Sequence, residues 1–333
     1  MGVKVAVVGS GSWGTALGSL LSRNGHDVTM WSRGLEVADL ITKRHENRVY
    51  LPGIELPAQL KATTDMGEAV TGAELVVAVV PSHAMRETME KVGPHLGGDA
   101  LVVSASKGIE DGTHKTMFNV ILDCIGGEQR IGVISGPSFA TEVAGGMPTV
   151  IVAAAQHQAV AEEVQKSFAS LTLRVYSSTD VIGVEIAGVV KNVIAIATGA
   201  GDGLGLGHNA RAATITRGLA ETQRLAVAMG ARPETLSGLS GLGDLVLTCT
   251  GDLSRNRQLG LRIGRGEDIN DILSGMRMVA EGVRNTKAVK ELAADHGVDM
   301  PIVNCCFEVL YKGMAPSQAL SELLGRSLKP EFH

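Results

Sequence analysis

Short apolar segments alternate with helical patterns over the first half of the chain, up to about residue 180. Most of these apolar segments are continuous, as expected for strands that are covered on both faces. Such an alternation predicts a parallel sheet wrapped by helices. The predicted strands are Val3–Val8, Val28–Trp31, Leu75–Val80, Leu101–Ser104, Ile131–Ile134, Val150–Ala154 and Leu173–Tyr176.

Long helical patterns separated by glycine-rich segments follow after about residue 180, where the strand-like segments stop. The Ser177-Ser178-Thr179-Asp180 cluster lies at this junction and can cap the next helix. We therefore expect an α/β domain over residues 1–179 and a helical domain over residues 180–333. The predicted helices of the second domain are 180–198, 210–229, 255–264, 284–296 and 301–312.

Composition narrows the classes of function. With 333 residues, 44% of them hydrophobic and 20% charged, the chain is typical of a folded two-domain protein. A net charge of -5 disfavours nucleic-acid binding as the main task. The four cysteines lack metal-site or disulfide spacing, which favours a reducing cytoplasm. The most apolar segment, 181–197, contains Glu185, Lys191 and Asn192, so we expect a buried helix and no membrane insertion.

A glycine-rich turn follows the first predicted strand and opens a helical segment, Thr15–Arg23. In this context Gly9 permits the tight turn, and Gly11 lets a pyrophosphate approach the backbone. Gly14 allows the helix to pack closely on the strand, and the helix N-terminus attracts the anion. The pattern predicts a dinucleotide site; the alternative is simply a tight turn between strand and helix.

The end of the second predicted strand bears on cofactor choice. Sites that prefer NAD place an acidic residue there, whereas this chain reads Trp31-Ser32-Arg33. A hydroxyl and a guanidinium suit a 2'-phosphate, so NADP(H) is favoured and NAD(H) is also allowed. The alternative is that Arg33 is a solvated surface side chain.

Lys191 stands within the apolar segment 186–197. Burial lowers the pKa of an ammonium group, which makes a lysine an acid–base catalyst near neutral pH. Asn192 beside it can orient a substrate oxygen. The alternative is an amphipathic helix on which Lys191 reaches out to water.

Glycine is concentrated at 199–207 and 238–244, which indicates backbone held close to another group. The polar residues that accompany the second segment offer an acid, hydroxyls, an amide and a guanidinium, suited to a small polyol phosphate. The alternative is turn chemistry between helices, with Asp244 and Ser254 as caps. These polar residues are Asp244, Thr248, Ser254, Arg255 and Asn256.

Several blocks in this order resemble the flavin-free, NAD(P)-dependent glycerol-3-phosphate dehydrogenases of the bacterial type. The resemblance covers essentially the whole chain. The blocks are GSGSWGTALG at 9–18, SKGIE at 106–110, SGPSFATEV at 135–143, VVKNVIAIATGAGDGLGLG at 189–207, GLSGLGDLVLTCTGDLSRNRQLG at 238–260 and VAEGVRNT at 279–286.

The resemblance implies a Rossmann-type, doubly wound, mostly parallel sheet followed by a helical domain like that of 6-phosphogluconate dehydrogenase. It implies reversible reduction of dihydroxyacetone phosphate to sn-glycerol 3-phosphate, a precursor of phospholipids, by a homodimer. Hydride transfer needs no metal if a lysine supplies the proton and cations hold the carbonyl and phosphate. Lys191 would be the acid–base residue, and Asp244 and Asn192 would orient it and the reacting hydroxyl.

The same resemblance implies two sets of binding residues. Those for the cofactor are Gly9, Gly11, Ser12, Trp13, Gly14, Arg33, Tyr50, Lys107, Ala140, Arg255, Val279 and Glu281. Those for the substrate are Lys107, Gly136, Ser138, Lys191, Asp244, Thr248, Ser254, Arg255 and Asn256. Ser138 stands where relatives often have threonine, which keeps the hydroxyl.

Two other functions are also compatible with the sequence. One is a dehydrogenase of the same architecture that acts on another hydroxy acid or sugar phosphate, because fold alone does not separate them. The other is a non-catalytic NADPH sensor whose closed state recruits a partner. The Ser254-Arg255-Asn256 block favours a short phosphate monoester, and the presence of Lys191 and Asp244 favours catalysis.

Overall fold

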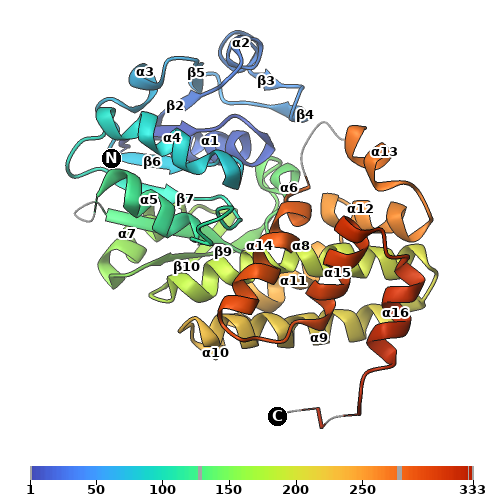
Figure 1. Ribbon diagram of the computed structural model, residues 1–333. Helices are drawn as coiled ribbons and strands as arrows, with labels where there is room; N and C mark the ends of the chain where they lie inside the picture. Colours follow the sequence, from blue (N-terminus) through green and yellow to red (C-terminus); the bar gives the residue numbers. More distant parts are fainter. Residues whose placement is uncertain (1, 127–129, 276–279, 329, 332–333) are drawn as a thin grey trace.

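The computed structural model describes residues 2–126, 130–275, 280–328 and 330–331. A sheet with helices on both faces forms the first region, coloured blue to green in Figure 1. A helical region follows, coloured yellow to red. The expected fold class is confirmed.

Eight strands of the described residues form one sheet in the order β10-β9-β8-β7-β6-β1-β2-β5. Neighbours pair in parallel except β8 and β9, which are antiparallel. The strands are β1 Lys4–Val8, β2 Asp27–Trp31, β5 Lys61–Thr63, β6 Leu75–Ala78, β7 Leu101–Ser104, β8 Arg130–Ser135, β9 Thr149–Ala155 and β10 Leu173–Ser178, with a separate hairpin of β3 Glu46–Asn47 and β4 Leu51–Glu55.

All seven predicted strands are present, and their ends differ from the prediction by at most two residues. The continuous apolar pattern is strongest in β6 and β7, which are buried along their whole length. The apolar pattern of the sequence did not predict β5 or the β3–β4 hairpin. β3 and β5 have only two and three residues, and β4 contains Pro52 and Gly53, which weaken the strand signal.

Helices cover both faces of the sheet. On one face α1, α2 and α7 bury apolar side chains against it, and on the other α3, α4 and α5 do so. In α4, for example, Met85, Met89 and Val92 share one helix face at helical spacing and are fully buried. The helices of this region are α1 Ser12–Arg23, α2 Leu35–Arg44, α3 Met66–Val70, α4 Met85–Val92, α5 Met117–Ile125, α6 Ala140–Ala144 and α7 Gln158–Phe168, with 3-10 turns at Ser82–Ala84 and Gly93–His95.

The helical region is built around α8, onto which α9, α11, α12, α14 and α15 pack (Figure 1). The side chain of Asp180 caps α8 by accepting from the Gly183 N–H, as the sequence predicted for this junction. The five predicted helices are present, and α10, α11, α13 and α16 are additional short ones. The bounds are α8 Val181–Gly203, α9 Gly207–Ala228, α10 Pro233–Ser237, a π-helical turn Leu239–Gly243, α11 Asp244–Thr250, α12 Arg255–Gly264, α13 Ile269–Ser274, α14 Glu281–Asp295, α15 Pro301–Lys312 and α16 Pro316–Leu324.

Among the described residues, α8 is the one helix long and apolar enough to cross a membrane. Most of it is buried inside the protein, which is the setting of a core helix. The expectation of a buried helix is confirmed.

The helix predicted to end at residue 198 continues as α8 into the first glycine-rich segment, as far as Gly203. Two of its glycines, Gly199 and Gly203, pack against α12. A Cβ on Gly199 would lie 2.1 Å from the carbonyl oxygen of Arg257, and one on Gly260 would lie 2.0 Å from that of Ile196. The two helix backbones therefore touch directly, and glycine is required for the approach.

Candidate active site

The turn after β1 has the geometry of a dinucleotide cradle. Gly9 adopts a φ of +123°, and a Cβ there would lie 2.4 Å from the carbonyl oxygen of Val79. A Cβ on Gly14 would lie 2.0 Å from the carbonyl oxygen of Gly9, whereas Gly11 faces open space. Gly11 also precedes the first turn of α1, which no side chain caps. The turn thus leaves room and helix N–H groups for a pyrophosphate.

The β3–β4 hairpin holds this turn from the side. Asn47 is fully buried and donates to the carbonyl oxygen of Ser10 at 2.9 Å and to the Thr15 hydroxyl at 2.8 Å. The Ser12 hydroxyl donates to the carbonyl oxygen of Tyr50. The sequence implied Ser12 and Tyr50 but missed Asn47, because the hairpin that carries it was not predicted.

Arg33 is exposed directly after β2, at the same edge of the sheet. Burial lowers the pKa of His83, and the positive charges of Arg284 and Arg33 lower it further. The charges of Arg33 and Arg284 therefore both reach His83 beyond the ends of β2 and β6, where the carboxylate of Asp111 opposes them. Such guanidinium groups suit a phosphate, whereas the exposure of Arg33 leaves the surface alternative open.

Trp13 and Ala140 lie together at the other side of the cradle. Trp13 is in the first turn of α1 and Ala140 begins α6, and both pack on the cluster formed by Ala16, Leu51 and Ala144. Two predicted cofactor residues that are far apart in sequence are thus neighbours of one apolar cluster.

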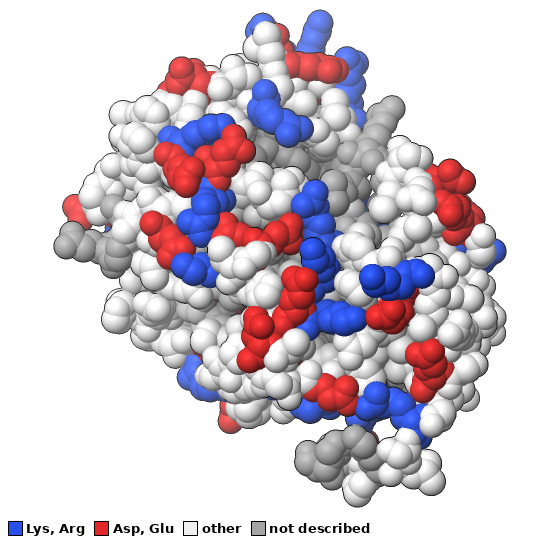
Figure 2. Space-filling view, in the orientation of Figure 1, with Lys and Arg blue, Asp and Glu red and all other residues white. Residues whose placement is uncertain are grey.

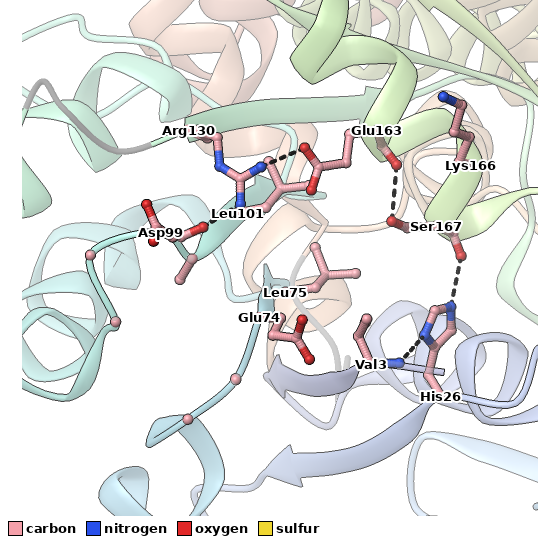
Figure 3. A pocket seen from close by; sticks show the side chains of 15 residues that line it. Val3, His26, Glu74, Leu75, Asp99, Leu101, Arg130, Glu163, Lys166 and Ser167 are labelled. Atoms are coloured by element: carbon pink, nitrogen blue, oxygen red, sulfur yellow. Dashed lines mark hydrogen bonds and ion pairs between the residues drawn. The ribbon is translucent and has the colours of Figure 1, made fainter. Parts of the chain in front are cut away.

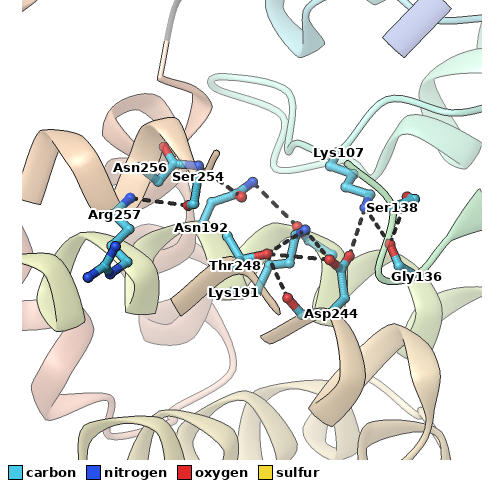
Figure 4. Close-up of polar contacts among 11 residues, drawn as sticks. Lys107, Gly136, Ser138, Lys191, Asn192, Asp244, Thr248, Ser254, Asn256 and Arg257 are labelled. Carbon is cyan, nitrogen blue, oxygen red and sulfur yellow. Dashed lines mark hydrogen bonds and ion pairs between the residues drawn. The ribbon is translucent and has the colours of Figure 1, made fainter. Parts of the chain in front are cut away.

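Lys191 projects from the middle of α8 into a buried polar cluster (Figure 4). Its side-chain nitrogen lies 2.5 Å from Oδ1 of Asp244 and donates to the Thr248 hydroxyl at 3.0 Å. Lys191 is 7% exposed and Asp244 is 1% exposed. The alternative in which Lys191 reaches out to water is therefore wrong.

Lys107 approaches the same carboxylate from the loop after β7, with 2.7 Å between its nitrogen and Oδ2 of Asp244. It also donates to the carbonyl oxygen of Gly136, which follows β8. The Ser138 hydroxyl donates to the same carbonyl oxygen at 2.9 Å. The carboxyl ends of β7 and β8 thus meet the helical region at Asp244, which lies between two ammonium groups (Figure 4).

Burial and charge set the protonation of this cluster. Burial lowers the pKa of Lys191 to about 7; the charge of Asp244 opposes this effect, and that of Lys107 reinforces it. Burial also acts to raise the pKa of Asp244, but Lys107 and Lys191 outweigh it and hold that pKa below its ordinary value. The cluster therefore contains a stable carboxylate and a lysine that exchanges its proton near neutral pH.

Asn192 and Asn256 form a second buried group next to Lys191. The Asn256 amide donates to Oδ1 of Asn192 at 3.0 Å, and its own oxygen accepts from the Gly282 N–H at 3.0 Å. Asn256 therefore links α8 to the start of α14. Ser254 caps α12 by accepting from the Arg257 N–H, which confirms one of the two caps considered from sequence.

The start of α12 is held by an ion-pair network around the buried Arg257–Asp202 pair, which was not predicted from the sequence. Arg257 is 8% exposed and pairs with Asp202 of α8 and with Asp252, each at 2.8 Å. Arg211 of α9 also pairs with Asp202 at 2.8 Å. These pairs fix the first turn of α12, where Ser254, Arg255 and Asn256 lie.

The charges of the Arg255 and Glu281 side chains interact. Burial raises the pKa of Glu281, while the Ser82 hydroxyl and the charge of Arg255 lower it. Ser82 follows β6 and donates to Glu281 at 3.1 Å, so this contact joins the two regions. The remaining predicted residue, Val279, lies outside the described residues.

A hollow of about 580 Å³ lies at the opposite edge of the sheet, where the parallel strands begin (Figure 3). Two of its polar side chains have partners within the protein. Arg130 forms an ion pair with Glu163 at 2.6 Å, and His26 is bonded to the backbone of Val3 and Ser167. Ligands of such sheets bind beyond the carboxyl ends of the strands, so this hollow is not a candidate for the active site.

Acidic and basic side chains are interspersed on the face shown in Figure 2, without a continuous basic surface among the described residues there. In the described part of the chain, no group of three or more His, Cys, Asp or Glu side chains could hold a metal ion.

Two family models match the chain. The model of the NAD-dependent glycerol-3-phosphate dehydrogenase N-terminus matches residues 4–161, and that of the C-terminus matches residues 180–321. The chain belongs to the NAD-dependent glycerol-3-phosphate dehydrogenase family. The sequence-based resemblance is thereby confirmed.

Members of this family are similar over the full length. The chain is 50% identical over 333 residues to glycerol-3-phosphate dehydrogenase (NAD(P)+) of Citrifermentans bemidjiense, covering 99% of each protein. It is 51% identical over 330 residues to that of Nitratidesulfovibrio vulgaris, covering 99% of this chain and 100% of the relative. The solved glycerol-3-phosphate dehydrogenase of Coxiella burnetii is 40% identical, with a TM-score of 0.94 over 98% of this chain and 99% of that chain.

Proposed function

We propose that this chain catalyses the reversible reduction of dihydroxyacetone phosphate to sn-glycerol 3-phosphate. The observation that carries the proposal is Lys191, buried and paired with Asp244, where the carboxyl edge of the sheet meets the helical region. A lysine with a pKa of about 7 can give or take a proton at neutral pH without a metal.

Each side chain of the cluster has a distinct task in this proposal. Lys191 donates a proton to the carbonyl oxygen at C2 in reduction and accepts the hydroxyl proton in oxidation. Asp244 holds the ammonium group of Lys191 in place, and Lys107 brings a second positive charge to the developing alkoxide. Asn192 orients the same oxygen through its amide.

The substrate phosphate is assigned to the N-terminal turn of α12. Ser254, Arg255 and Asn256 lie there, and the helix N-terminus favours an anion. Arg257 and Asp202 hold this turn against α8, so the phosphate site keeps a fixed distance from Lys191. The proposed pocket between Lys191 and the phosphate site is completed by Thr248, Gly136 and Ser138.

The residues after β1 fit a nicotinamide dinucleotide, since Gly11 leaves open space at an uncapped helix N-terminus. When bound, the reduced nicotinamide supplies the hydride that forms the new C2–H bond. Family members named NAD(P)+-dependent are consistent with either cofactor. We propose a preference for NADP(H), supported by Arg33 and the missing acidic residue.

The finer assignments follow from this function. We propose that residues 1–179 bind the cofactor and residues 180–333 carry the substrate site and the acid–base lysine. We also propose a cytoplasmic homodimer that supplies glycerol 3-phosphate for phospholipid synthesis.

A steady-state assay tests the function directly. Oxidation of NADPH or NADH is followed on adding dihydroxyacetone phosphate to the wild type and to Lys191→Ala. We expect turnover by the wild type and a loss of about 10²- to 10⁴-fold in kcat in the variant, with cofactor binding retained.

A wild type that binds NADPH normally but turns over no dihydroxyacetone phosphate would refute the substrate assignment. Turnover of another hydroxy acid or sugar phosphate would favour a different dehydrogenase, and a lack of any turnover would favour the sensor.

A further inference from the structure

Glu185 is a buried carboxyl group on α8 that the proposed mechanism does not use. It is 8% exposed and lies between one and two helical turns before Lys191. Its Oε1 accepts from the backbone N–H of Phe118 at 2.9 Å, at the start of α5. A side chain of the helical region thus caps a helix of the sheet region.

This contact reaches the loop that carries Lys107. The segment from β7 to α5 turns back on itself through a bridge between Ile109 and Thr116, and Thr116 is the N-cap residue of α5. Because Glu185 holds the first turn of α5, it also holds the end of this loop on α8.

The same loop packs directly on α8 beside Glu185. A Cβ on Gly188 would lie 3.0 Å from the Ser135 hydroxyl and 3.5 Å from Cγ of Lys107. Gly188 stands one turn after Glu185, so Glu185, Gly188 and Lys191 follow one another along the side of α8 that meets the loop.

The second oxygen of Glu185 has no hydrogen-bond partner among the described residues, although it is buried. The Ser135 hydroxyl is in the same state. Both residues line a small cavity of about 10 Å³, together with Lys107 and Gly188. This volume is close to that needed for one water molecule, and two unpaired polar groups are the partners that such a water needs.

We propose that Glu185 is a positioning residue: it fixes the Lys107 loop against α8 through the start of α5 and through one water shared with Ser135. It acts through Lys107, whose nitrogen lies 2.7 Å from the carboxylate that pairs with Lys191. The proposal rests on the proposed function, since it assigns Glu185 to the geometry of that site.

Burial raises the pKa of Glu185 to about 7, although the polar groups at the start of α5 act to lower it. A carboxyl that only capped α5 would need one oxygen. The second oxygen is buried and borders only the cavity, which indicates a further hydrogen-bond partner in that cavity.

The helical region offers a matched control. Glu221 is 3% exposed, and burial raises its pKa to about 7 as well. It caps α15 by accepting from the N–H groups of Ile302 at 2.8 Å and Val303 at 3.3 Å. Glu221 is thus a buried capping carboxyl that does not touch the Lys107 loop.

The test compares Glu185→Ala, Glu185→Gln and Glu221→Gln. We expect kcat/KM for dihydroxyacetone phosphate to fall by about 10- to 100-fold in Glu185→Ala, because a displaced Lys107 loses its alignment. The Kd for NADPH should change by less than kcat/KM does, since the turn after β1 is held by other residues and Lys107 is only one of the expected cofactor contacts. Glu185→Gln keeps an acceptor oxygen and should recover most of the loss.

Glu221→Gln should lower the urea midpoint to an extent similar to Glu185→Gln and leave kcat/KM within about two-fold of the wild type. Wild-type kcat and KM in Glu185→Ala, at a comparable loss of stability, would overturn the proposal and leave Glu185 as a cap. If Glu185→Ala does not fold, Glu185→Gln combined with Ser135→Ala takes its place, because it removes the carboxylate charge and the hydroxyl that shares the water.

Amide hydrogen exchange of residues 105–118, measured on the same proteins, does not depend on turnover. We expect faster exchange there in Glu185→Ala and no change in Glu221→Gln. Unchanged exchange would refute the positioning role even if the wild type proved inactive, whereas an inactive wild type with the expected exchange would refute only the proposed function.

Discussion

Replacement of Lys191 by methionine should change how the stability of the protein depends on pH. Methionine keeps a flexible apolar stem of similar length and removes the ammonium group. In the folded protein, burial lowers the pKa of Lys191 from 10.5 to about 7. Between these two values the unfolded chain holds a proton that the folded protein has released. The free energy of unfolding of the wild type should therefore rise with pH in this window.

The magnitude follows from linkage. Each unit of pH between the two pKa values contributes up to about 1.36 kcal/mol. From about pH 6 to about pH 9, the wild type should gain roughly 2.5 kcal/mol of unfolding free energy relative to Lys191→Met, most of it above pH 7. Glu185 and Glu221 also titrate near pH 7, but both proteins contain them, so their effects cancel in the difference.

Urea unfolding of the two cofactor-free proteins at several pH values measures this difference. Lys191→Met should also be inactive at every pH. Stability curves that run parallel from pH 6 to pH 9 would show that Lys191 keeps an ordinary pKa. That result would refute the argument that burial prepares it for proton exchange.

Two further outcomes are expected. Gly260→Ala should lower the free energy of unfolding by about 3 kcal/mol, because its Cβ would lie 2.0 Å from the carbonyl oxygen of Ile196. Gly201→Ala on the neighbouring helix has no such contact and should stabilise by about 0.5–1 kcal/mol, so equal effects in thermal unfolding would contradict the close packing. Arg33→Asp should shift the ratio of kcat/KM for NADPH to that for NADH by about tenfold or more towards NADH. Arg44→Asp, at the end of α2, serves as its control, and an unchanged ratio in Arg33→Asp would refute the NADP preference.

The sequence by itself determined the features that depend on local patterns. Seven strands of the sheet were predictable because β-branched and apolar runs, most of them largely buried, leave a nearly continuous signal. The turn at Gly9–Gly14 was predictable because each glycine answers a local steric demand. Lys191 was predictable as a functional residue because it is a charged side chain within an apolar helix. Its neighbours in sequence could not exclude a side chain that reaches out to water.

Only the tertiary structure decided between such alternatives. Lys107, Lys191 and Asp244 are separated by more than fifty residues at each step, and the fold brings them within one ion-pair cluster. From composition, the glycines that begin at Gly199 would be expected to end the helix. They instead continue α8 to Gly203, because α12 packs directly on the backbone there.

Glu185 illustrates the same limit. In the sequence it is one charge within an apolar segment, and its hydrogen bond to Phe118 spans 67 residues. Periodicity reports which face of a helix is apolar, because that depends on neighbours three and four residues apart. It does not report which distant backbone group or ammonium group meets a buried carboxylate, because those contacts and their pKa shifts arise only when separate elements pack together.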